Sequence, residues 1–83
     1  MKPKIHIKSI DLCDAFHSGM ALAAYEDGEI VCCFQYKDDG SIYNLEFLSS
    51  SFCEPIEIPN HERFVAEASI TKLVEEKLYH AQD

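Results

Sequence analysis

The chain has 83 residues, of which 47% are hydrophobic and 27% charged, and its formal net charge at pH 7 is −8. This length and composition indicate one small globular domain and exclude a disordered or low-complexity segment. The negative charge excludes direct nucleic-acid binding as the main activity, because neutralisation of phosphates by basic residues provides most of the affinity for nucleic acid.

The N-terminal part is expected to hold a strand and a short helix. Residues 5–8 alternate apolar and polar side chains, as in a half-buried strand. Residues 10–17 follow a capping residue, Ser9 or Asp11, and precede Gly19, at which a helix would stop. The pattern therefore predicts a short N-terminal helix after the possible strand.

The centre of the chain predicts a three-stranded antiparallel meander. Residues 20–25 form an apolar run, residues 30–36 and 42–48 are rich in β-branched and aromatic side chains, and residues 26–29 and 37–41 between these runs each contain Asp-Gly. Asp-Gly between such runs favours a hairpin, because glycine accepts the positive φ of the turn. By alternation, the apolar face of this sheet is expected to consist of Ile30, Cys32, Phe34, Tyr36, Tyr43, Leu45 and Phe47.

A long C-terminal helix is expected over 61–80, after Pro59 and with Asn60 as its cap. A helical period places one apolar stripe on Phe64, Ala68, Val74, Leu78 and Tyr79. Packed across the apolar face of the meander, this helix gives a two-layer α+β domain over residues 1–83.

The expected order helix–strand–strand–strand–helix resembles the architecture of double-stranded-RNA-binding domains. The resemblance concerns topology alone. Those domains depend on basic residues at a helix start, whereas here His61-Glu62-Arg63 follows an acidic stretch. No functional residue is carried over from it.

The four cysteines are expected to be reduced. Cys32 and Cys33 are adjacent in an extended run and point to opposite sides, so they suit no shared bridge. No signal-peptide core follows the N-terminal lysines, and no apolar run has the length of a membrane span. We therefore expect a cytoplasmic protein that does not contact the membrane.

Two sets of side chains are candidates for catalysis or metal binding. Cys13 and His17 are one helical turn apart in the predicted short helix and could meet as a nucleophile and its base. Adding Cys53 and His61 gives four potential zinc ligands, although tight Cys-x2-Cys pairs are missing. Ordinary packing residues and free thiols are the favoured interpretation of both sets. We therefore expect a protein that is not an enzyme and has neither cofactor nor metal.

The charge is distributed unevenly. Residues 11–62 contain eleven acidic residues against Lys37 alone, a net charge of −10, whereas residues 1–10 contain three lysines and no acid. Solvated turns account for most such clusters, and the alternative is a set of carboxylates that replaces phosphates on a basic protein. The residues expected to bind such a partner are Glu26, Asp27, Glu29, Asp38, Asp39 and Glu67.

These observations predict a non-enzymatic protein-binding module, an inhibitor or regulator that occupies the nucleic-acid-binding site of a basic partner. Small acidic α+β proteins without catalytic motifs are common among phage and mobile-element products, including inhibitors of host nucleases and CRISPR complexes. This part of the prediction is an analogy with a class of proteins.

The second face of the sheet provides an alternative function. Val31 and Cys33 remain there once a helix covers the other face, together with every second residue of 20–25. Such a face is more apolar than solvent contact requires. Either the short N-terminal helix covers it, or a second copy or a partner does. The alternative is therefore a structural homodimer or assembly subunit that associates through Val31 and Cys33, or through an edge strand.

Overall fold

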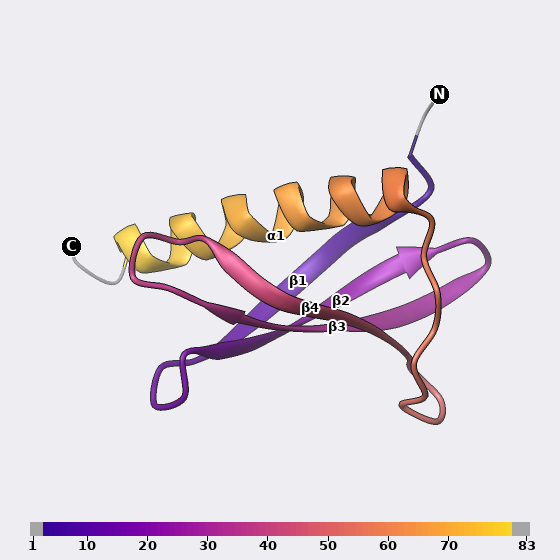
Figure 1. Cartoon of the computed structure of the whole chain (residues 1–83), viewed down its shortest axis with the longest axis horizontal. Helices are drawn as coiled ribbons and strands as arrows, with labels where there is room; N and C mark the ends of the chain where they lie inside the picture. Colours follow the sequence, from indigo (N-terminus) through magenta and orange to yellow (C-terminus); the bar gives the residue numbers. More distant parts are fainter. Residues whose placement is uncertain (1–2, 81–83) are drawn as a thin grey trace.

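In a computed structural model, which describes residues 3–80, four antiparallel strands form one sheet and a single helix crosses one of its faces (Figure 1). The strands β1 (His6–Cys13), β2 (Ser18–Tyr25), β3 (Gly28–Tyr36) and β4 (Ile42–Ser49) lie in sequence order, and α1 (Asn60–His80) follows them. The predicted α+β meander with a long C-terminal helix is confirmed. The sheet has a fourth strand at its N-terminal edge.

The predicted N-terminal helix over 10–17 is wrong. Residues 10–13 belong to β1 and residues 14–17 form the turn to β2, with His17 at a φ of 48°. Eight residues are marginal for a helix without packing, whereas pairing with β2 gives alternate residues of β1 backbone partners and buries Ile10. The order is thus four strands and a helix, which differs from the double-stranded-RNA-binding topology.

The predicted alternation holds in β3 and fails at one place in β4. Ile30, Cys32, Phe34 and Tyr36 are all buried, as expected. Leu45 and Phe47 are buried too, but Tyr43 is 41% exposed. A β-bulge explains the difference: β4 has one extra residue opposite β3 near Asn44, whose φ is 54°. An extra residue reverses the side-chain alternation beyond it.

The two Asp-Gly turns use their glycines differently. Gly40 has a φ of 92°, as the hairpin prediction requires. In the first turn Gly28 instead pairs with Tyr25 inside the ladder, and Glu26 adopts the left-handed conformation with a φ of 55°. The turn therefore lies one or two residues earlier than the Asp-Gly signal indicates.

The helix has the predicted span. Of the predicted stripe, Val74 is buried and Leu78 partly buried, but Ala68 is exposed, and the side that faces the sheet is rotated away from Phe64. Ala66, Ile70 and Val74 are fully buried, whereas Phe64 is 73% exposed and Tyr79 is also exposed. Apolar residues occur around most of the helix, so periodicity alone does not fix its rotation. No helix within residues 3–80 is long and apolar enough to cross a membrane.

Candidate functional site

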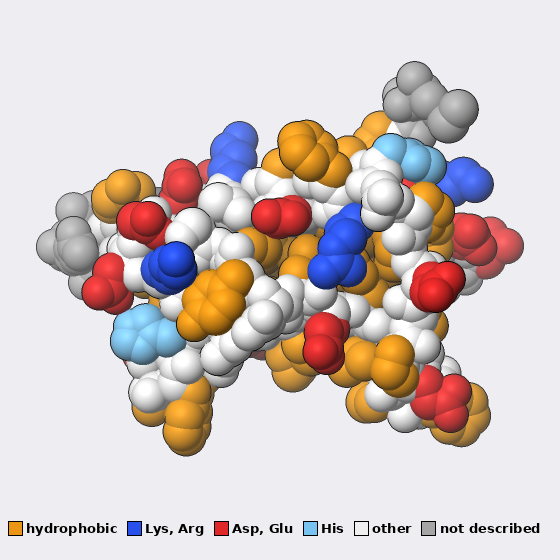
Figure 2. All heavy atoms as spheres, viewed as in Figure 1, with side chains coloured by type: hydrophobic (Ala, Val, Ile, Leu, Met, Phe, Trp, Pro, Cys, Tyr) orange, Lys and Arg blue, Asp and Glu red, His pale blue; other side chains and the backbone are white. Residues whose placement is uncertain are grey.

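The six acidic residues expected to bind a partner lie in three separate places. Three surround the β2–β3 turn, two lie in the β3–β4 turn at the opposite end of the sheet, and one is on α1 (Figure 1). All six are exposed. They are Glu26, Asp27 and Glu29 at the β2–β3 turn, Asp38 and Asp39 in the β3–β4 turn, and Glu67 on α1. Figure 2 shows acidic side chains scattered over the visible face, with basic side chains among them. These six residues therefore do not form one surface.

Several of these carboxylates have partners within the domain. Glu29 forms an ion pair with Lys8. Asp38 Oδ1 lies 3.2 Å from His17 Nε2. Asp39 Oδ1 accepts hydrogen bonds from the Ser41 hydroxyl, at 2.6 Å, and from the Ser41 backbone N–H, at 2.9 Å. The Ser41 hydroxyl and then its N–H hold the pKa of Asp39 below its ordinary value, so Asp39 shapes its own turn.

Val31 and Cys33 lie on the side of the sheet opposite α1. The strand register places Leu22 and Leu48 beside Val31, and Met20 beside Cys33. We call these five apolar residues the open sheet face. With a strand in place of the predicted short helix, no helix or second sheet within residues 3–80 covers it, and Met20 is 54% exposed.

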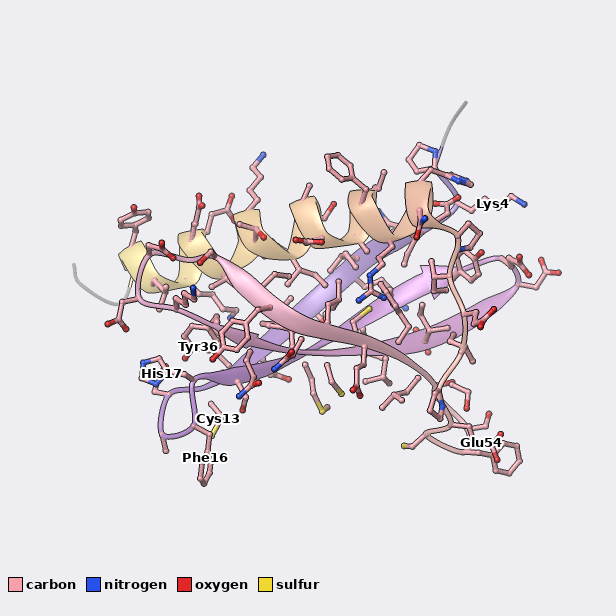
Figure 3. All side chains as sticks on the ribbon, in the orientation of Figure 1. Lys4, Cys13, Phe16, His17, Tyr36 and Glu54 are labelled. Atoms are coloured by element: carbon pink, nitrogen blue, oxygen red, sulfur yellow. The ribbon has the colours of Figure 1, made fainter. Side chains whose placement is uncertain are left out.

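Two loops project at opposite ends of the sheet, on the side away from α1 (Figure 1). The β1–β2 turn carries Phe16, which is 75% exposed, and the loop after β4 carries Phe52, which is 78% exposed. Figure 2 shows hydrophobic side chains at both tips, and Figure 3 shows Phe16 pointing away from the sheet. Exposed aromatic side chains therefore flank the open sheet face at both ends.

Carboxylates border the open sheet face on both sides. Asp11 of β1 pairs with Met20, and Glu46 of β4 pairs with Cys33, so one row across the sheet reads Asp11, Met20, Cys33, Glu46. Side chains directly opposite each other in antiparallel strands lie on the same face. An apolar strip between two carboxylates suits a partner that is itself apolar and basic.

The structure separates the potential nucleophile from its base. Cys13 ends β1, and His17 lies four residues on, at the other end of the turn. The His17 ring lies beside Tyr36, at 5.5 Å between ring centroids, and its Nε2 faces Asp38 (Figure 3). No hydrogen bond joins Cys13 to His17 among the described residues.

The four potential zinc ligands also lie apart. Cys13 and His17 belong to the β1–β2 turn, Cys53 to the loop after β4, and His61 to the start of α1, where its Nε2 is 3.6 Å from Glu62. Within residues 3–80, no three His, Cys, Asp or Glu side chains are grouped to hold a metal ion.

Burial differs among the thiols. Burial, followed by the neighbouring Cys33, raises the pKa of Cys32 to about 12. Burial, then Glu46 and Cys53, raise the pKa of Cys33. Cys13 and Cys53 are exposed. Since the thiolate is the reactive form, Cys32 is the least reactive of the four.

Alkylation of the native protein at pH 7 is therefore expected to modify Cys13 and Cys53 first, Cys33 more slowly, and Cys32 only after unfolding. Mass spectrometry of peptides from a time course identifies the order. If Cys32 reacts in the native protein as fast as Cys13, its buried position beneath α1 is contradicted.

Sequence reasoning missed the buried carboxylate of Glu62. Its Oε1 and Oε2 each accept the Lys4 N–H at 2.9 Å, and Oε1 accepts the Ile5 N–H at 3.2 Å. Figure 3 shows Lys4 beside the first turn of α1. The Lys4 N–H, and then the Ile5 N–H, hold the pKa of Glu62 below its ordinary value against the opposing effect of burial. The partners are 58 residues apart, so no local pattern predicts them.

A second missed contact joins β3 to the β1–β2 turn. The Tyr36 hydroxyl donates to Asp14 Oδ1 at 2.9 Å. Burial, and then this hydrogen bond, raise the pKa of Tyr36 to about 12. Tyr36 therefore stays neutral at physiological pH and fixes the turn that carries Phe16.

No protein-family model, no curated protein and no solved structure matches this chain.

Proposed function

We propose that this protein is a non-enzymatic protein-binding module that inhibits or regulates a basic partner by occupying its nucleic-acid-binding site. The open sheet face provides the apolar contact, and the surrounding carboxylates attract the cationic surface of the partner. A nuclease or a CRISPR-type complex is the kind of partner that the proposal names.

One observation carries the proposal: the open sheet face is apolar, uncovered by the described secondary structure, and bordered by Asp11 and Glu46. Exposed apolar patches with a charged border are typical of protein interfaces. The net charge of −8 adds a long-range attraction for cationic surfaces.

The remaining acidic residues are assigned a weaker role. Those of the two turns and of α1 lie in three places, so a single flat partner does not contact them all. In the proposal they raise the association rate through the overall field, because distant surface charges act mainly on encounter.

The test captures partners from an extract of the native host with the tagged protein and then elutes them in two ways. Raising the ionic strength from about 0.01 M to about 1 M shortens the Debye length from about 30 Å to about 3 Å. We expect the salt to release a basic nucleic-acid-binding protein, and excess duplex DNA or RNA to displace it at low salt. A partner that is retained under both treatments contradicts the proposal.

The same open face supports a second candidate, a homodimer or assembly subunit in which Val31 and Cys33 of two copies meet. Sedimentation of the purified protein over a range of concentrations separates the two functions. A dimer that persists at micromolar concentration favours assembly, and a monomer favours the proposed binding module. Charge argues against the dimer, since each copy carries −8.

A further inference from the structure

The two edge strands of the sheet differ in their backbone contacts. The outward backbone groups of β4 from Leu45 to Ser49 form hydrogen bonds with later residues of the chain. The Ser49 N–H donates to the Glu54 carbonyl at 2.8 Å, and the Ile56 N–H donates to the Phe47 carbonyl at 2.9 Å. Further along, the Arg63 guanidinium donates to the Leu45 carbonyl at 2.6 Å. These contacts use the backbone groups that an added strand would need.

The β1 edge is open along its C-terminal half. The Tyr36 N–H donates to the His17 carbonyl, so His17 and every second residue after it bond to β3. The residues of β2 between them therefore bond to β1. With the observed register, every second residue of β1 from Ser9 bonds to β2, and Ile10 and Leu12 between them direct their N–H and C=O groups outward. No described residue forms a backbone hydrogen bond with these two outward positions.

An apolar groove of about 810 Å³ lies beside this open edge, between β1 and the C-terminal half of α1. Its apolar lining comes from Ile10 and Leu12 on the strand and from Leu73 and Leu78 on the helix. In an added strand, alternate side chains point to the same face of the sheet as Ile10. The backbone of such a strand would pair with β1 while those side chains enter the groove.

The charges beside this edge indicate which segment fits. The Asp11 side chain lies on the same face as its cross-strand neighbour Met20, opposite the groove, and in the groove itself Asp14 and Glu76 stand against Lys77 alone. A second copy would bring the same carboxylates and a further net charge of −8 to the edge. When the apolar side chains of an added strand enter the groove, the side chains between them lie on the face of Asp11, so lysine or arginine at those positions complements this carboxylate.

We infer that the β1 edge and the adjoining groove bind an extended peptide segment in which apolar residues alternate with lysine or arginine, added to the sheet as a fifth strand. Strand addition takes its affinity from main-chain hydrogen bonds and its specificity from alternate side-chain positions. The site lies on an edge of the sheet rather than on the open sheet face, so it stands or fails separately from the proposed function.

The test uses a labelled synthetic peptide of about seven residues with alternating valine and lysine, which covers the roughly 17 Å of β1 from Ser9 to Cys13 at about 3.3 Å per residue. Fluorescence anisotropy gives its affinity, and backbone NMR shifts give its position. We expect shifts at Ile10 and Leu12. N-methylation of one alternate set of peptide residues should weaken binding at least about tenfold, and N-methylation of the other set should not.

A charge-reversal pair tests the recognition of lysine. Asp11→Lys, on β1 and on the face that the lysines of the peptide share, is expected to weaken binding about threefold to tenfold at low salt, whereas Glu57→Lys, an exposed residue away from this edge, leaves it unchanged.

Four results would overturn the inference. These are no binding, equal effects of both N-methylated peptides, shifts confined to the open sheet face, and protection of Ile10 and Leu12 by self-association without peptide. The last result would identify a second copy as the occupant of the edge.

Discussion

Replacement of Leu22 by glutamate is expected to weaken partner binding by at least about 30-fold, because burying an unpaired carboxylate in an apolar interface costs about 2 kcal/mol or more. Leu22 belongs to the open sheet face, lies opposite Val31 and is 40% exposed. A carboxylate there would be desolvated beside the apolar surface of the partner. Titration of the purified partner with the wild-type and variant proteins measures the change in Kd.

Phe64→Glu provides the matched control for this prediction. It makes the same kind of change, from a large apolar side chain to a carboxylate, at a residue that is 73% exposed on α1. Its Kd is expected to stay within about twofold of the wild-type value, and both variants should unfold at similar temperatures because exposed positions tolerate substitution. Equal loss of binding in both variants would show that the open sheet face is not the interface.

Replacement of Glu62 by glutamine is expected to cause the largest loss of stability among the acidic residues. Glu62 is 2% exposed, and its two oxygens accept the N–H groups of Lys4 and Ile5. A glutamine amide keeps the shape and one acceptor oxygen, but its NH₂ group replaces the second oxygen and faces the Lys4 N–H, and the negative charge that strengthens these hydrogen bonds is lost. We expect Tm to fall by on the order of 10 °C, as measured by circular dichroism.

The effect depends on pH in a defined direction. Because the folded protein holds the pKa of Glu62 below its ordinary value of 4.5, the carboxylate stabilises the fold above that value. This stabilisation is lost as the pH falls through the depressed pKa of the folded state. The wild type and Glu62→Gln should therefore differ most near neutral pH and converge as the solution becomes acidic.

Glu67→Gln is the control for this experiment, since it makes the same substitution on the exposed side of the same helix. Its Tm should match that of the wild type throughout. A constant difference between Glu62→Gln and the wild type from neutral to strongly acidic pH would contradict the role of the ionised carboxylate.

The sequence is informative where local patterns agree with the final packing. The apolar run of β2, the β-branched and aromatic runs of β3 and β4, and the start of α1 after Pro59 predict these elements well. The pattern over 10–17 suits a helix face as well as a strand, and pairing with β2 decides the outcome. The buried side of α1 includes the carboxylate of Glu62, whose backbone partners are distant in the sequence, so hydrophobic periodicity does not identify it.

The residues of the candidate surface are likewise predicted by the sequence only in part. The sequence predicts that Val31 and Cys33 share a face apart from the helix, and the sheet adds Met20, Leu22 and Leu48 to them. It also predicts exposed acidic turns before and after the strand that became β3, and therefore at opposite ends of the sheet, as observed. The bulge at Asn44, which turns Tyr43 outward, has no signal in the alternation of β4.

Cys33 belongs to the open sheet face. The most direct test of how this protein acts is to measure the alkylation rate of Cys33 with and without the bound partner. The rate for the unfolded chain provides the reference. We predict that binding slows the reaction of Cys33 at least about tenfold, as expected for a side chain at the core of an interface. An unchanged rate at saturating partner would contradict binding through this side of the sheet.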